Sequence, residues 1–160
     1  MATAYIGIGS NLGNREENCF RAIEFLIERG VKVTNRSSLY KTAPWGIKDQ
    51  PEFINMAIEV ETEVSPGELL RILKEIEVRL GRNKGKRWGP RVIDLDILFY
   101  DTLILKTPDL EIPHPGVSDR TFILKPLSEI APDKIHPVLK TTVKDLFFKS
   151  RDLDKPKSSG

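Results

Sequence analysis

The sequence predicts an α+β fold built on a mostly antiparallel sheet that helices flank. Stretches of strand and helix periodicity follow one another through the 160 residues in the order β-α-β-β-α-β. The middle two strands have no helix between them, and strands joined without a crossover pair antiparallel. This is the order of a ferredoxin-like βαββαβ core, here with a C-terminal extension.

The first half of the predicted core is a strand, a helix and a second strand. Residues 3–9 alternate in polarity, and apolar residues recur at helical spacing from Cys19 to Ile27. Gly30 follows as the kind of residue that ends a helix in a left-handed conformation. Residues 31–42 are the next predicted strand.

The second half begins with a predicted strand at 53–62. Ser65 and Glu68 form a capping box with proline at the first helical position, so a helix begins there and ends at Gly81. The last strand of the core covers 92–99. Beyond it the sequence predicts an apolar piece, a proline-rich turn, a short helix around 119–125 and a last helix near 142–149.

Two long segments have neither helical nor strand periodicity. The first, APWGIKDQP at 43–51, separates two predicted strands and is a candidate for a mobile loop. The second, RNKGKRWGPR at 82–91, contains five basic residues, two glycines and a proline. Composition therefore predicts two irregular loops, one before each of the last two strands of the core.

Composition is that of an ordinary globular protein. Lys and Arg exceed Asp and Glu by only two, 25 against 23, so the overall charge gives no argument for a nucleic-acid partner. Cys19 is the only cysteine, which fits a reducing compartment. No run approaches the roughly 20 apolar residues that cross a bilayer. We expect one domain over 1–154, a disordered tail at 155–160, a cytoplasmic location and no membrane partner.

Asp94 and Asp96 are the first signal of chemistry. They alternate with three apolar residues along a predicted strand, so both carboxylates share one face, with Cα atoms about 6.6 Å apart. Mg²⁺ typically binds one or two carboxylates together with waters and substrate phosphates. The pair therefore predicts a nucleotide–magnesium site, and a half-exposed strand with a polar outer face is the alternative.

A basic segment comes directly before this pair. It contains Arg82, Lys84, Lys86, Arg87 and Arg91. Guanidinium groups bind phosphate oxygens and neutralise charge on a phosphoryl group during its transfer, so cations beside paired carboxylates indicate a polyphosphate site. Two alternatives stay open: a nucleic-acid-binding module in which Trp88 stacks on bases, and another Mg²⁺-dependent enzyme such as a nuclease or nucleotidyltransferase.

Other candidate motifs carry less information. The sequence has no phosphate-binding P-loop, and GIGSNLGN, with Gly7, Gly9 and Gly13, lacks the spacing of a dinucleotide fingerprint, so it predicts a strand-to-helix turn. His114 lies between two prolines, which suits a positioned ligand contact or a structural turn equally. With His136 far away in the sequence, no zinc cluster is indicated.

Several motifs occur in one order from residue 5 to about residue 137. They are YKTAPWG at 40–46, DQPEFIN at 49–55, Glu77, RWGPR at 87–91, DLD at 94–96 and PHP at 113–115. With this combination the chain resembles the 6-hydroxymethyl-7,8-dihydropterin pyrophosphokinases of folate biosynthesis. The resemblance implies Mg²⁺-dependent transfer of pyrophosphate from ATP to the hydroxymethyl group of the reduced pterin, with release of AMP.

The resemblance also implies residue roles. Asp94 and Asp96 would hold two Mg²⁺ ions, and the catalytic set would add Arg82, Arg87 and Arg91. The pterin would contact Thr42, Ala43, Trp45, Phe53, Asn55 and Phe122, with its ring between the two phenylalanines. ATP would contact Lys74, Glu77, Arg82, Trp88, Arg91, Ile97, His114 and Arg120. The alternatives are that the phenylalanines belong to the core and that Glu77 and Arg120 are solvated surface residues.

The same resemblance implies small-molecule partners, ATP and the reduced pterin, and no nucleic acid. We expect a monomer and a stand-alone form without a fused dihydropteroate synthase or aldolase domain. The loops at 43–52 and 82–91 would close over the substrates and exclude water. Lys74, Pro115 and Ala43 depart from the residue types that the family pattern favours, which affects single contacts. No residue is identified as the base that takes the hydroxyl proton.

Overall fold

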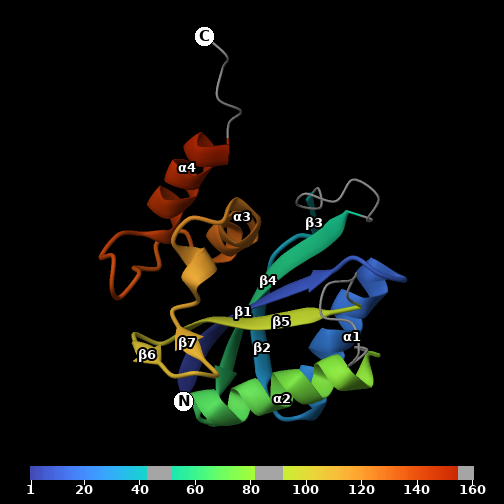
Figure 1. Cartoon of the computed structure of the whole chain (residues 1–160). Coiled ribbons are helices and arrows are strands. Elements are labelled where there is room, and N and C mark those ends of the chain that lie inside the picture. Colours follow the sequence, from blue (N-terminus) through green and yellow to red (C-terminus); the bar gives the residue numbers. More distant parts are fainter. Residues whose placement is uncertain (43–51, 82–91, 155–160) are drawn as a thin grey trace.

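The computed structural model describes residues 1–42, 52–81 and 92–154. Its centre is an antiparallel sheet with the strand order β2-β4-β1-β5, and β3 also pairs with β4 (Figure 1). The strands are β1 (Ala2–Ser10), β2 (Lys32–Arg36), β3 (Tyr40–Thr42), β4 (Phe53–Thr62) and β5 (Asp94–Tyr100). The predicted α+β fold with a mostly antiparallel sheet is confirmed.

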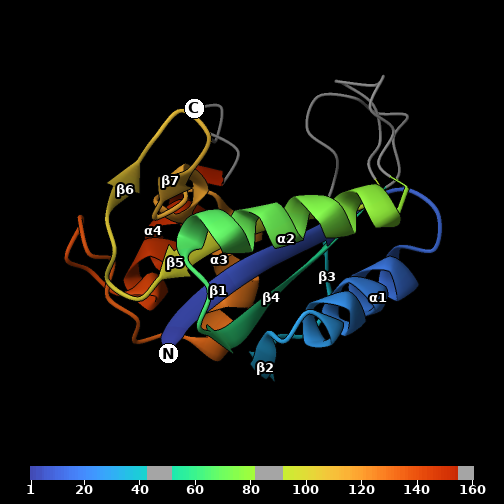
Figure 2. The same ribbon diagram turned by 90° about the horizontal axis from the view of Figure 1, so that it is seen from below.

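Helices cover both faces of this sheet. One face carries α1 (Arg15–Glu28) and α2 (Pro66–Arg79), which run side by side across the strands (Figure 2). The opposite face carries α3 (Thr121–Ile130), which packs on β4 and on α4 (Val143–Asp154). A small hairpin of β6 (Leu105–Lys106) and β7 (Glu111–Ile112), then a 3₁₀ turn at Pro115–Val117, connect β5 to α3.

Each face of the sheet has its own apolar core. Ile6, Ile8, Met56 and Leu95 belong to the cluster under α1 and α2. Tyr5, Ala57, Leu98 and Phe99 belong to the cluster under α3 and α4. Because successive strand residues point to opposite faces, the even-numbered residues of β1 supply the first core and its odd-numbered residues face the second.

The helix boundaries agree with the capping signals. Asn14 and Ser65 accept hydrogen bonds from the backbone N–H groups of Glu17 and Glu68, one turn into α1 and α2. Gly81, where the second helix was expected to end, has φ +99°, a conformation that glycine adopts without steric cost. The starts of both helices and the end of α2 therefore follow from the local sequence.

Several predicted boundaries differ from the structure. The expected strand at 31–42 is interrupted at 37–39, where the Ser37 hydroxyl, in place of a backbone carbonyl, accepts from Ala57 N. The strand expected at 92–99 starts two residues later. The short helix expected at 119–125 continues to Ile130 through Pro126, because the buried side chains of Leu124 and Leu127 keep its apolar face against the core.

No helix among the described residues is long and apolar enough to cross a membrane. The segments 43–51, 82–91 and 155–160, predicted as two loops and a tail, lie outside the described residues.

The packing of α2 generates a stability prediction. Leu73 is fully buried between α2 and the sheet, whereas Val78 on the same helix is 52% exposed. Leu73→Ala should lower the free energy of unfolding by about 3 kcal/mol, because it removes buried methyl groups and leaves a cavity. Val78→Ala is the control and should change it by less than about 0.5 kcal/mol. Urea unfolding followed by circular dichroism measures both, and equal losses would contradict this placement of the helix.

Candidate active site

The floor of the site is a row of residues across three neighbouring strands. Asp94 of β5 pairs with Gly9 of β1, which pairs with Asn55 of β4. One row along, Asp96 pairs with Gly7. Directly opposite residues point to the same face of a sheet, so two carboxylates and an amide share the face that α3 covers, with glycine between them.

The two glycines make room on this face. A Cβ atom added to Gly9 would lie 2.9 Å from Asn55 Oδ1, closer than such atoms approach in proteins. Gly7 and Gly9 lie inside β1, as the strand predicted at 3–9 implies, so the strand-to-helix turn predicted from GIGSNLGN covers only its later part, where Gly13 has φ +72°. Their spacing of two was the signal of a shared strand face.

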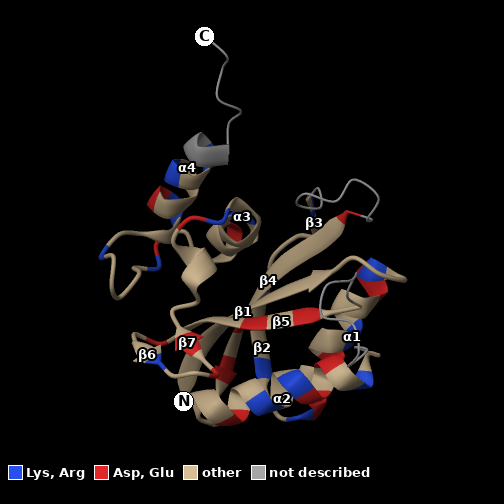
Figure 3. Cartoon of the chain, viewed as in Figure 1, with Lys and Arg blue, Asp and Glu red and all other residues tan. Residues whose placement is uncertain are grey.

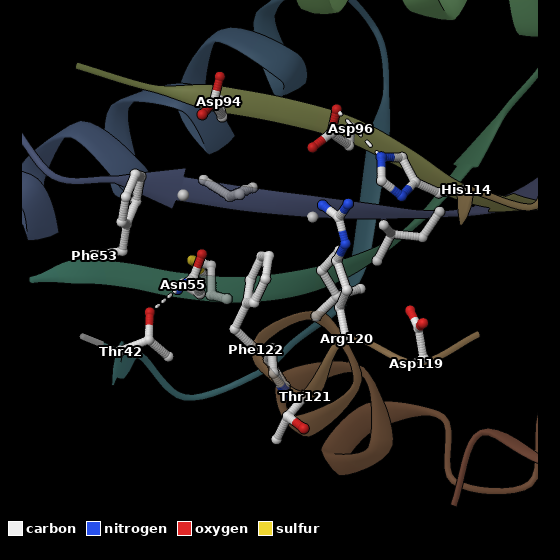
Figure 4. Close-up of a pocket in the computed structure, with 17 residues that line it drawn as sticks. Thr42, Phe53, Asn55, Asp94, Asp96, His114, Asp119, Arg120, Thr121 and Phe122 are labelled. Carbon is white, nitrogen blue, oxygen red and sulfur yellow. Dashed lines mark hydrogen bonds and ion pairs between the residues drawn. The ribbon is translucent and has the colours of Figure 1, made fainter. Parts of the chain in front are cut away.

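A cleft of about 920 Å³ opens between this face and α3. β3 and β4 contribute Thr42, Phe53 and Asn55, β5 contributes Asp94 and Asp96, and the segment leading into α3 contributes His114, Arg120 and Phe122 (Figure 4). These residues lie far apart in the sequence. The cleft therefore gathers all the predicted pterin and metal residues that the structure describes.

Two aromatic rings stand on either side of an amide in this cleft. Figure 4 shows Asn55 between Phe53, at the start of β4, and Phe122, in the first turn of α3. Both phenylalanines are only partly buried and belong to neither core cluster, so the alternative that they are core residues is wrong. Asn55 Nδ2 donates to Thr42 Oγ1 at 2.8 Å, which fixes the direction of the amide.

The carboxylates lie on the opposite side of the cleft. Asp94 is partly buried and Asp96 is exposed, and acidic residues mark β5 in the middle of the molecule (Figure 3). His114 Nε2 lies 3.9 Å from Asp96 Oδ1. His114 Nδ1 accepts from Gly116 N, so in the neutral imidazole Nε2 carries the hydrogen and presents it toward the carboxylate side of the cleft.

The oxygen donors fit a magnesium ion that a substrate helps to hold. In the described part of the chain, no group of three His, Cys, Asp or Glu side chains could hold a metal ion by itself. Asp94 and Asp96 supply two hard oxygen ligands at an open cleft, and Mg²⁺ usually takes its remaining ligands from phosphates and water. The residues present therefore fit a Mg²⁺ ion that is held partly by the substrate, and they do not form a closed structural metal site.

Glu77 lies behind the carboxylates. Its side chain is 2% exposed, and its Oε2 accepts from Leu95 N at 2.9 Å, while Oε1 lies 3.5 Å from Lys74 Nζ. β5 is the edge strand of the described sheet, so Glu77 satisfies an outward-facing N–H group between Asp94 and Asp96. The alternative of a solvated surface residue is wrong for Glu77. It lines neither cavity, and its contact with ATP stays a prediction.

A smaller cavity of about 220 Å³ adjoins the cleft and shares Asp96 and His114 with it. Lys74 of α2 and Ile97 of β5 also line this cavity. Three residues predicted to contact ATP, Lys74, Ile97 and His114, therefore meet here, and Arg120 lies in the larger cleft.

Some residues of the cleft were not predicted from the sequence, and some predicted site residues lie outside the described residues. The structure adds Asp119, Thr121, Ile123 and Pro126 to the cleft, all at or near the start of α3, where the sequence signalled only a short helix. Six predicted site residues lie outside the described residues, and their roles stay predictions: Ala43, Trp45, Arg82, Arg87, Trp88 and Arg91.

Comparisons with known proteins agree with the resemblance that the sequence motifs indicate. The model of the 7,8-dihydro-6-hydroxymethylpterin-pyrophosphokinase (HPPK) family matches residues 5–132. A relative from Aquifex aeolicus, named 2-amino-4-hydroxy-6-hydroxymethyldihydropteridine pyrophosphokinase, is 39% identical over 98% of this chain and 96% of its own length. A Bacillus subtilis protein of the same name is 46% identical over 79% of this chain and 77% of its own.

Some relatives are much longer. The folic acid synthesis protein fol1 of Pneumocystis carinii is 46% identical over 94% of this chain, which spans 20% of that protein. A crystal structure of Plasmodium falciparum HPPK-DHPS superposes with a TM-score of 0.73 at 20% identity, over 97% of this chain and 45% of that one. This likeness shows the same fold.

The family match at residues 5–132 thus covers the strands of the central sheet, the cleft and helix α3, which lines it. Together with relatives of nearly the same length, it shows that the chain belongs to the 7,8-dihydro-6-hydroxymethylpterin-pyrophosphokinase family.

Proposed function

We propose that this chain transfers pyrophosphate from ATP to the hydroxymethyl group of 6-hydroxymethyl-7,8-dihydropterin and releases AMP, as a step of folate biosynthesis. Membership of the family supports the reaction. The observation that carries the proposal is the cleft itself, which places two carboxylates on one side and an amide between two aromatic rings on the other. This arrangement suits a flat heterocycle next to a polyphosphate.

The pterin would bind between Phe53 and Phe122. A flat ring system gains dispersion and offset stacking from aromatic faces on both sides. Asn55 offers both a donor and an acceptor to the ring edge, and its bond to Thr42 holds the amide in one orientation before the substrate arrives. Specificity would come from this amide, because stacking by itself tolerates many flat rings.

The phosphates would lie on the carboxylate side of the cleft. Asp94 and Asp96 would hold Mg²⁺, two ions by the family pattern, and the bound metal would supply positive charge against that of the polyphosphate. His114, which lies beside Asp96, and Arg120 would contact phosphate oxygens in the same part of the cleft. Lys74 and Ile97 would line the nucleotide part of the site in the adjoining cavity.

The chain's own contribution to the reaction is orientation. The hydroxymethyl oxygen of a pterin held between Phe53 and Phe122 would face the carboxylate side, where the β-phosphorus would lie in line for attack. Glu77 keeps β5, and so both aspartates, in position. Arg82, Arg87 and Arg91 would complete the charge compensation, and Trp88, Ala43 and Trp45 would join from the two loops.

Several expectations belong to the same proposal. We treat residues 1–154 as one pyrophosphokinase domain that acts as a monomer in the cytoplasm, with ATP and the reduced pterin as its partners. The family membership favours this function over the nucleic-acid module and the nuclease or nucleotidyltransferase that the basic segment by itself leaves open.

The product of turnover tests the reaction directly. Protein incubated with ATP, Mg²⁺ and 6-hydroxymethyl-7,8-dihydropterin should release AMP in equal amount to the pyrophosphorylated pterin, as measured by chromatography. Chelation of the metal should stop the release. Formation of ADP, or nucleotide turnover that does not depend on the pterin, would overturn the proposal.

The carboxylates generate a second prediction. Asp96→Asn or Asp94→Asn should lower kcat by about 100-fold or more, because an amide keeps the shape but loses the charge that holds the metal. Steady-state kinetics at saturating ATP measures this loss. Asp133→Asn is the matched control, since Asp133 is exposed and does not line the cleft. Near-normal turnover in either site variant would contradict the metal assignment.

The stacking face that Phe122 would offer to the pterin generates a third prediction. Phe122→Leu should raise KM for the pterin by about 3- to 10-fold, because an aliphatic side chain fills the space but loses the stacking face. KM for ATP should stay within twofold. Phe148→Leu on the exposed face of α4 is the control and should change neither constant. Equal effects of Phe122→Leu on both substrates would argue against a pterin slot at this position.

A further inference from the structure

Helix α3 is tied to strand β3 by a cluster that lies outside the cleft. The Glu129 carboxylate accepts from Ser38 N at 3.0 and 3.1 Å and from Tyr40 Oη at 2.5 Å. One helical turn earlier, Lys125 Nζ lies 5.1 Å from the centre of the Tyr40 ring. Two side chains of α3 therefore hold one tyrosine. We refer to Tyr40, Lys125 and Glu129 as the Tyr40 clamp.

The charge states favour this contact. The hydrogen bond to Glu129 raises the pKa of Tyr40 to about 12, so its hydroxyl stays protonated. Desolvation raises the pKa of the Glu129 carboxyl, but the hydrogen bonds from Tyr40 and Ser38 outweigh it and leave the pKa below its usual value. At neutral pH a phenol therefore donates to a carboxylate, a charge-assisted and directional hydrogen bond, here at an exposed position where water competes for the same groups.

The clamp lies on the helix face that forms the cleft wall. Phe122, Pro126 and Glu129 are spaced i, i+4, i+7, so they lie along one side of α3, and Phe122 and Pro126 line the cleft. Seven residues of α helix span about 10.5 Å. A shift of the clamp end of α3 toward or away from the sheet would therefore be transmitted to Phe122 by a short, rigid element.

The other partner of the clamp is the strand pair that carries the rest of the slot. Tyr40 pairs with Asn55, and Thr42 pairs with Phe53. Tyr40 is thus two residues from Thr42, which accepts from the Asn55 amide. The clamp connects the strands that present Phe53 and Asn55 to the helix that presents Phe122.

The separation of the two aromatic walls matters for a ring bound between them. A gap that widens by 0.5 to 1 Å forfeits about a quarter to a half of the dispersion attraction on that side. Leu124 and Leu127 hold α3 on the sheet through apolar contacts, which have no preferred direction. The bonds of the clamp add a directional contact between the far end of the helix and β3.

We propose that the Tyr40 clamp sets the width of the slot between Phe53 and Phe122, which makes Tyr40 and Glu129 positioning residues for the pterin. The inference rests on the proposed function, because it assumes that the pterin binds in this slot. The clamp does not touch the substrate. Its effect should therefore fall on pterin affinity and leave the phosphate side of the cleft unchanged.

Tyr40→Phe tests this inference, because it keeps the ring over which Lys125 lies and removes only the hydroxyl. The Kd of 6-hydroxymethyl-7,8-dihydropterin, titrated calorimetrically in the presence of a non-hydrolysable ATP analogue, and its KM should both rise by about 3- to 10-fold. The Kd of the analogue and KM for ATP should stay within twofold. Tyr100→Phe is the matched control, since the Tyr100 hydroxyl donates to Val64 O away from the cleft, and it should change none of these constants.

Glu129 variants provide the second arm. Glu129→Gln keeps an acceptor for Tyr40 and should have an intermediate effect. Glu129→Leu removes the bonds to both Tyr40 and Ser38, so its effect should be at least that of Tyr40→Phe. The double variant Tyr40→Phe/Glu129→Leu should be no worse than Glu129→Leu, because the bond to the Tyr40 hydroxyl is already lost in that variant. Additive effects in the double variant would overturn the clamp.

The outcomes separate the inference from the proposed function. Wild-type protein that neither binds nor converts the pterin would defeat the proposed function. Wild-type activity with unchanged pterin constants in Tyr40→Phe would overturn the inference and leave the function standing. Equal loss of pterin and ATP affinity in Tyr40→Phe would also overturn it, because that pattern indicates general loosening of the fold.

Discussion

The absence of side chains at two positions of β1 is the constraint on which the site depends. β1 is flanked by β4 and β5, and Gly7 and Gly9 face α3 where a larger residue would fill the cleft or displace Asn55. The carboxylates of β5 and the amide of β4 can face a common space only because the strand between them has no side chains there. A Cβ atom at Gly9 would lie 2.9 Å from Asn55 Oδ1, so the amide would have to move from its place in the cleft.

The functional side chains are supported from outside the cleft on both sides. Glu77 reaches from α2 to the edge of β5 and binds Leu95 N, between the two aspartates. Glu129 reaches from α3 to Ser38 and Tyr40, next to the strands that carry Asn55 and Phe53. Both supports are carboxylates that accept backbone or phenol hydrogens, which are directional bonds that apolar packing does not supply.

The residues of the site were easier to predict from the sequence than the burial and contacts of those residues. The alternation in 93–97 was enough to place Asp94 and Asp96 on one face, because strand geometry is local. The burial of Glu77 was not predictable in this way, since it depends on where α2 crosses the edge of the sheet. The break in the strand expected at 31–42 is of the same kind: Ser38 there binds Glu129, 91 residues away.

The sequence by itself determined the order of the elements, the helix cap at Ser65, the shared face of the paired aspartates and the family to which the motifs point. Only the tertiary structure decided that Gly7 and Gly9 form a floor and that Tyr40 ties α3 to β3, and it placed Asn55 between the two phenylalanines that the resemblance implied as walls. Periodicity and caps depend on neighbours within one helical turn or two strand residues. The site depends on how distant elements pack, and that is settled by strand order and by contacts between side chains far apart in the chain.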